Sequence, residues 1–114
     1  MQHSMKLLAV PFEKMKSGIK TVEIRLYDEK RQELQVGDII EFSKLLNLDE
    51  KITVEVVNLL RYASFRDLVH DYGMEYYGYP KDYPPEDFIT SIYTIYSKEE
   101  EEKYGVLGIQ VKVL

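Results

Sequence analysis

Cysteine is absent from the 114 residues of this chain, and histidine occurs only twice, as His3 and His70. Without cysteine the chain forms no disulfide, offers no thiolate to a metal and has no cysteine nucleophile. Two histidines that lie far apart make no recognisable metal-binding motif. We therefore expect neither a bound metal nor a cofactor.

Long apolar stretches are also missing, since no run approaches the roughly 18 apolar residues that a membrane span needs. The segment Met1–Lys6 has no basic start with a long apolar stretch and no small-residue cleavage site, so we expect no signal peptide. These absences predict a cytoplasmic protein that does not enter membranes. With 45% hydrophobic and 31% charged residues, residues 1–114 are expected to form a single domain around one core.

The net charge of −5 is unevenly distributed along the chain. Residues 1–44 carry +1, whereas residues 45–114 carry −6 and include the run Glu99–Glu102. This balance disfavours tight non-specific binding to nucleic acid, which depends on neutralising many phosphates. The sequence is nevertheless compatible with a local basic patch built from Lys14, Lys16, Lys20, Arg25, Lys30 and Arg31.

The hydrophobic pattern predicts five strands with short helices between them. The strands are expected over residues 3–10, 21–26, 39–43, 52–60 and 106–113, with a turn at residues 47–50. Helices are expected to begin near Pro11, Ser64, Glu86 and Ser97, the last being a single turn. This order favours an α+β fold, a mixed β-barrel of about five to six strands with two or three short flanking helices.

The stretch from Gly18 to Arg25 is the most informative about function, because a turn glycine leads directly into a strand with two unlike faces. Successive strand residues point to opposite sides. One side carries Val22, Ile24 and Leu26, and the other carries Thr21, Glu23 and Arg25. A turn can bring the ammonium of Lys20 over the polar side. An amine, a hydroxyl, a carboxylate and a guanidinium so close together predict a site for a polar ligand.

Three motifs resemble the ASCH domain family, named for the activating signal cointegrator homology region, whose members have a PUA-like β-barrel. They are the signature Gly18-x-Lys20-x-x-Glu23-x-Arg25, the turn and strand Val36-Gly37-Asp38-x-Ile40-x-Phe42, and the final stretch from Tyr96 to Ile109. Together they frame almost the whole chain in the right order. The resemblance implies a single PUA-like domain over residues 1–114.

The resemblance also implies a function, since the family is generally proposed to bind RNA or modified nucleosides in a cleft lined by the signature. The implied ligand-binding residues are Lys20, Thr21, Glu23 and Arg25. Arg25 would grip a phosphate or carbonyl oxygen, and Glu23 would accept from an amino or hydroxyl group. A plainer alternative is that Lys20 is solvated and that Glu23 and Arg25 form an exposed ion pair of little value.

A small bacterial branch of the family implies a second function, the deacetylation of N4-acetylcytidine by an amidohydrolase. In that branch a lysine, matched here by Lys20, activates a threonine three residues later. That nucleophile position is occupied by Glu23 in this chain, while Thr21 lies directly beside the lysine. The catalytic residues of this alternative would be Lys20, Thr21 and Glu23, with Glu75 or Glu86 as the nearest candidates for a distal acid or base.

A third alternative is a protein-interaction module that uses the acidic second part of the chain and the tyrosine-rich loop. That loop contains four tyrosines, which are Tyr76, Tyr77, Tyr79 and Tyr83. Their rings could stack on bases, but they are more typical of side chains that anchor a long loop to the core. We likewise interpret His3 as structural rather than as part of a site.

Overall fold

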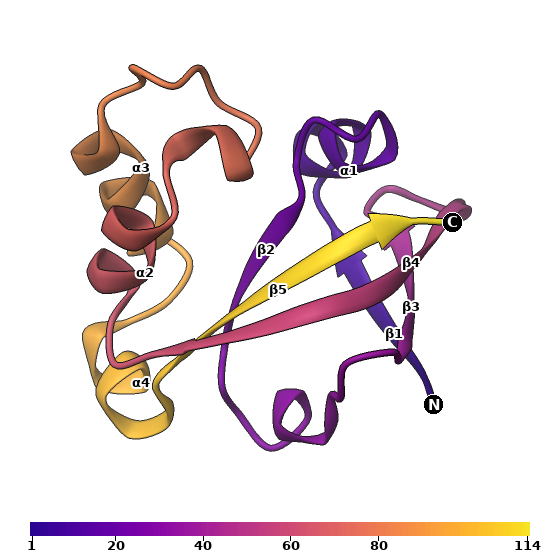
Figure 1. Cartoon of the computed structure of the whole chain (residues 1–114), viewed down its shortest axis with the longest axis horizontal. Coiled ribbons are helices and arrows are strands. Elements are labelled where there is room, and N and C mark those ends of the chain that lie inside the picture. The colour runs from indigo at the N-terminus through magenta and orange to yellow at the C-terminus, as the bar shows by residue number, and fades with distance from the viewer.

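The computed structural model describes residues 1–114 as a strongly curved sheet with helices packed on both of its sides (Figure 1). Its strands are β1 (Gln2–Leu7), β2 (Val22–Leu26), β3 (Ile39–Lys44), β4 (Asn47–Tyr62) and β5 (Val106–Val113). Its helices are α1 (Ala9–Lys16), α2 (Phe65–Asp71), α3 (Pro85–Ile92) and α4 (Lys98–Tyr104), with short 3₁₀ turns at Arg31–Glu33 and Met74–Tyr76. None of the helices has both the length and the apolar character needed to cross a bilayer.

The strands form one mixed sheet in the order β1-β3-β4-β5-β2. The pairing of β1 with β3 is parallel and the other pairings are antiparallel. The expected α+β class and mixed, barrel-like sheet are confirmed. Four helices are present where two or three were expected to flank the barrel, because the turn expected after Ser97 extends over seven residues.

The two edge strands, β1 and β2, do not pair with each other, so the barrel is open along a seam between them. Side chains bridge this seam in place of a backbone ladder. Arg25 donates from Nη2 to the Lys6 carbonyl oxygen at 2.7 Å, and Lys30 Nζ donates to the Ser4 carbonyl oxygen at 2.8 Å. The seam is therefore lined with polar groups from both edge strands and the loop that follows β2.

Two apolar clusters hold the fold, one on each side of the sheet, where the sequence predicted a single core. Phe12 and Met15 of α1 pack on the inner side of the curved sheet together with residues such as Phe42. On the other side, helices α2 and α3 cover β2 and its neighbours. The single-core expectation was wrong because β5 places Val106 in one cluster and Leu107 in the other, so both sides of this strand need cover.

The largest differences from the predicted boundaries lie at the end of β1 and at the start of β4. The first strand ends at Leu7 and α1 begins at Ala9, before Pro11, which still lies in the first helical turn where its missing N–H breaks no bond. The turn expected at residues 47–50 lies instead at Leu45 and Leu46, because β4 already pairs at Asn47. Leu46 adopts a φ of 72° to make this tight connection.

Candidate functional site

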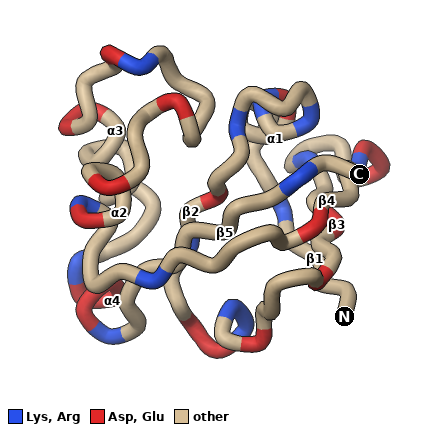
Figure 2. Tube along the Cα trace, in the orientation of Figure 1, with Lys and Arg blue, Asp and Glu red and all other residues tan.

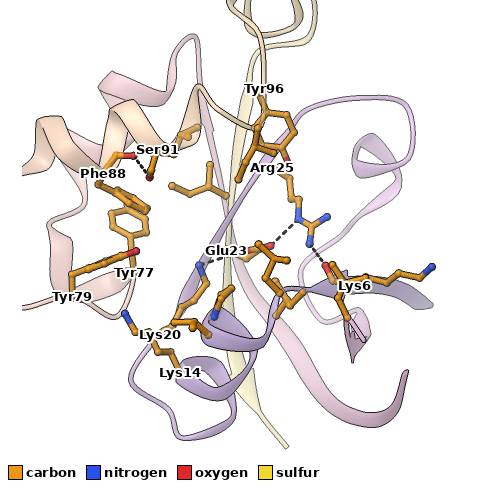
Figure 3. A pocket seen from close by; sticks show the side chains of 18 residues that line it. Lys6, Lys14, Lys20, Glu23, Arg25, Tyr77, Tyr79, Phe88, Ser91 and Tyr96 are labelled. Carbon is orange, nitrogen blue, oxygen red and sulfur yellow. Dashed lines mark hydrogen bonds and ion pairs between the residues drawn. The ribbon is translucent and has the colours of Figure 1, made fainter. Parts of the chain in front are cut away.

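A cleft of about 350 Å³ opens where the seam of the barrel meets α1 and α3 (Figure 3). Its polar groups include Lys20, Glu23 and Arg25. Its aromatic side chains are Tyr77, Tyr79, Phe88 and Tyr96, and its aliphatic ones include Leu8, Val10, Leu45, Ile92 and Ile95. A concave, mostly apolar cavity with a few convergent polar groups is the usual form of a small-ligand site.

Glu23 is the centre of the polar floor, since each of its carboxylate oxygens contacts a different cation. Lys20 Nζ lies 3.1 Å from Oε1, and Arg25 Nε donates to Oε2 at 2.8 Å. Lys20 and Glu23 are only 7% and 6% exposed, so these charges meet away from bulk water. Arg25 is additionally fixed by its bond to the Lys6 carbonyl across the seam.

The turn between α1 and β2 brings Lys20 into this cluster. Gly18 follows the end of α1 with a φ of 83°, a conformation that suits glycine. The backbone N–H groups of Ile19 and Lys20 then both donate to the Lys14 carbonyl at 3.0 Å. Lys20 also forms an isolated backbone bridge with Tyr77, which ties the start of β2 to the loop before α3.

The charge of Glu23 is set by two opposing effects. Burial alone would raise the pKa of its carboxyl group, but the Lys20 ammonium and the Arg25 guanidinium more than offset burial and hold this pKa below its usual range. Glu23 is therefore ionised at neutral pH. One carboxylate between two cations leaves the floor of the cleft with a net positive charge.

Three aromatic side chains, Tyr77, Tyr79 and Phe88, form a wall beside this floor, whereas Tyr96 lies next to Arg25 (Figure 3). The ring of Phe88 lies 5.1 Å from that of Tyr77 and 5.2 Å from that of Tyr79, measured between centroids. The Tyr77 hydroxyl donates to the Leu68 carbonyl, and burial raises the pKa of Tyr77. Burial also raises the pKa of Tyr96. These tyrosines stay neutral, and both line the cavity.

The structure brings together three of the four ligand-binding residues that the sequence suggested. Lys20, Glu23 and Arg25 line the cleft, whereas Thr21 is not among the lining residues. The backbone of Thr21 links two other segments, since its N–H donates to Tyr76 and its carbonyl accepts from Val111. That link holds the start of β2 in place and leaves the hydroxyl outside the cavity.

Other residues considered from the sequence lie away from the cleft. Glu86 pairs with Arg66, and Glu75 is exposed and does not line the cavity. His3 is buried against Asp38, with 2.8 Å between Nε2 and Oδ2, in agreement with a structural role. Across the chain, no three histidine, aspartate or glutamate side chains gather as metal ligands would.

The aromatic wall and the contribution of α3 were missed by sequence reasoning. Ile89 and Ile92 are the buried pair of α3, whereas Phe88 is half-buried and Ile95, just beyond the helix, is 66% exposed. Phe88, Ile92 and Ile95 all line the cleft. The tyrosine-rich loop was correctly predicted to be anchored, because Tyr77 is buried. The same ring also lines the cavity, so anchoring and lining are not exclusive.

The predicted basic patch divides into two groups. Lys14, Lys20 and Arg25 line the cleft, whereas Lys16, Lys30 and Arg31 do not. Lys30 bonds across the seam to Ser4, and Arg31 pairs with Asp28. Half of the predicted basic patch therefore lies in the cavity and half lies outside it.

Comparison with known proteins places this architecture in a family. The ASCH domain model matches residues 5–114. The crystal structure of the hypothetical protein PH0355 is 33% identical over all of both chains, with a TM-score of 0.88. The solution structure of protein PF0455 from Pyrococcus furiosus is 34% identical, with a TM-score of 0.78, and covers all of this chain and 98% of its own. No curated protein matches the sequence. The chain belongs to the ASCH domain family.

Proposed function

We propose that the cleft binds a modified nucleoside or a single nucleotide of an RNA strand. The observation that carries this proposal is the pairing, within one cavity, of a buried Lys20–Glu23–Arg25 cluster with a wall of aromatic rings. Family membership supports it, because ASCH domains are proposed to bind RNA or nucleosides. The polar cluster would select the base and the aromatic wall would hold its ring.

The polar cluster is suited to hydrogen-bond acceptors on the ligand. Arg25 uses Nε for Glu23 and Nη2 for the Lys6 carbonyl, which leaves Nη1 without a protein partner. The ammonium of Lys20 carries three N–H donors, more than its contact with Glu23 requires. Base carbonyl and ring-nitrogen atoms would accept these bonds, and charge-assisted hydrogen bonds are the stronger kind.

The aromatic wall is suited to the flat face of a base. Tyr79 and Phe88 are half-buried, so their rings are partly accessible from the cavity. Stacking on aromatic side chains is the usual means by which proteins hold unpaired bases, and each stacked base contributes about 1–3 kcal/mol. A base inserted between the wall and the polar floor would be recognised on its face and its edge at once.

The geometry favours binding over the amidohydrolase alternative. Both oxygens of Glu23 already contact cations, so this carboxylate is poorly placed to attack an acyl carbon or to activate water. Thr21, the nearest hydroxyl in the signature, does not line the cavity. Chromatography of N4-acetylcytidine incubated with the protein checks this choice, since release of cytidine would favour the hydrolase.

The binding proposal is tested by calorimetric titration of the protein with a panel of nucleosides, modified nucleosides and short single-stranded RNAs. Saturable binding is expected for at least one member. Substitution Lys20→Ala or Arg25→Ala should abolish it, because either change removes donors from the polar floor. Circular dichroism of each variant establishes that the fold is retained.

Two further variants test the aromatic wall and supply a control outside the cleft. Tyr79→Leu removes a ring without touching the buried charges, and it should weaken binding by about tenfold or more, as expected for a lost stacking contact. Arg31→Ala removes a cation that lies outside the cleft and should change nothing. Unaltered titrations for the cleft variants, or no binding by any member of the panel, would overturn the proposal.

A further inference from the structure

The cleft is positively charged although the protein as a whole is acidic. Its lining includes Lys6, Lys14, Lys20 and Arg25 but a single carboxylate, Glu23, in a chain whose net charge is −5. Figure 2 shows that acidic residues are spread along the rest of the chain, including α2 and α4. A cationic cavity in such a protein attracts anions, because the low-dielectric walls of a cleft focus its field.

Lys14 is the cation that the other contacts of the cleft leave available. Lys20 and Arg25 are paired with Glu23, and Lys6 extends away from the cavity (Figure 3). The neighbouring acid on α1, Glu13, is paired with Lys44. No carboxylate pairs with Lys14.

Lys14 is also held in position rather than free in solvent. Its ammonium lies 4.0 Å from the centroid of the Tyr79 ring, a cation–π distance. The aliphatic part of its side chain packs against Gly78. A Cβ atom added to Gly78 would lie only 2.8 Å from Lys14 Cδ. The side chain is half-buried. A fixed ammonium beside the aromatic wall marks the place where a charged part of a ligand would sit.

We propose that the ligand carries a phosphate group next to its base and that Lys14 contacts this phosphate; this inference rests on the proposed function. Lys20 is buried on the floor, whereas Lys14 is only half-buried. A phosphate is costly to remove from water, so it stays at the half-exposed cation while the base enters the cavity. The ligand class is a nucleoside monophosphate, either free or as the terminal nucleotide of an RNA strand.

The test compares matched ligands by calorimetry. Cytidine, uridine, adenosine and guanosine are each titrated beside the corresponding 5′-monophosphate. The monophosphate is expected to bind at least about tenfold more tightly than its nucleoside, which is the size of one charge-assisted hydrogen bond. This preference should shrink as ionic strength rises, because salt screens the contact.

A matched pair of lysine variants assigns the effect to one side chain. Lys14→Gln should abolish the preference for the monophosphate over the nucleoside, so that the two members of each pair bind with equal affinity. Lys16→Gln, on the same helix but outside the lining of the cleft, should keep the preference. A pair of RNA oligonucleotides that differ only in a 5′-phosphate or a 5′-hydroxyl then separates a strand end from a free nucleotide.

The outcomes distinguish this inference from the proposed function. Equal affinity for nucleoside and monophosphate, or a preference that survives Lys14→Gln, overturns the phosphate contact and leaves nucleoside binding standing. Binding of inorganic phosphate alone, with no contribution from the base, contradicts both proposals. If neither nucleosides, monophosphates nor RNA bind, both proposals fail.

Discussion

Both carboxylate oxygens of Glu23 are held by cations, Lys20 at 3.1 Å and Arg25 at 2.8 Å. Removing any one member of such a buried cluster destabilises the fold, because the remaining charges are then desolvated and unpaired. Glu23 therefore has two roles. It fixes the direction of the two cations that face the ligand, and it compensates their charge within the fold.

Replacing Glu23 by glutamine should destabilise the protein by about 3 kcal/mol at neutral pH, the usual cost of breaking a buried ion pair. Urea unfolding of the Glu23→Gln variant measures this loss. Glu33→Gln serves as the control, because Glu33 is exposed and takes part in none of the ion pairs of the structure. A loss no greater than that of the control would show that Glu23 is not part of a buried charged cluster.

The loss of stability in the Glu23→Gln variant is expected to depend on pH. In the folded protein the pKa of Glu23 lies below its ordinary value of 4.5. Its contribution to the free energy of unfolding is therefore fully present above about this pH and is lost as pH falls through the folded-state pKa. The stability difference between wild type and Glu23→Gln should therefore shrink on acidification below pH 4.5. A difference that stays constant into acid would contradict the lowered pKa.

At the scale of single residues, the sequence predicts a good part of the polar floor. Strand alternation correctly places Glu23 and Arg25 on the side opposite Val22 and Ile24, which pack under α2 and α3. It does not predict how far Glu23 is buried. That burial comes from the seam, where β1 lies opposite β2, and from a lysine that precedes the strand.

At the scale of elements, the turn between α1 and β2 decides where Lys20 lies. Gly18 has a φ of 83° and no other atoms lie within 4 Å of the place where its Cβ would be. The conformation, rather than crowding, is therefore what requires glycine. The backbone of Lys20 is then secured twice, by the Lys14 carbonyl and by the bridge to Tyr77.

Gly18→Ala should lower the free energy of unfolding by roughly 1–2 kcal/mol, the cost of a left-handed conformation for an ordinary residue. Chemical denaturation measures it. Gly18→Asn should lose less, because asparagine tolerates this conformation better. Equal stability of the alanine variant and wild type would mean that the turn does not need a positive φ.

The residues that cap a helix can be recognised in the sequence, whereas the elements against which the helix packs cannot. The predicted caps Ser64 and Ser97 each accept a backbone hydrogen bond from the first turn of a helix, and Ser97 completes a capping box. The side of α3 that meets the cleft could not be predicted. Phe88 and Ile92 follow one helical spacing, and only the packing of α3 on the sheet decides which of them is buried.

At the scale of the whole molecule, the cleft is a consequence of the open barrel. The edges of β1 and β2 are joined by side chains rather than by a ladder, and α1 and α3 flank the opening. Residues distant in sequence, such as Lys20 and Phe88, meet only there. This is why the sequence predicts the class of the fold and the signature but not the aromatic wall. The cytoplasmic location expected from the sequence stays a prediction.

The most direct test of a nucleoside-binding cleft is amide-resolved NMR of the isotope-labelled protein titrated with the tightest-binding nucleoside or nucleotide of the panel. The largest shifts are expected at Lys20, Glu23, Arg25, Tyr77 and Tyr79, with little change at residues remote from the cleft such as Thr53. Shifts centred elsewhere, for example on the shallow hollow between Arg61 and Lys103, would contradict the account, as would a spectrum that no nucleoside or RNA alters.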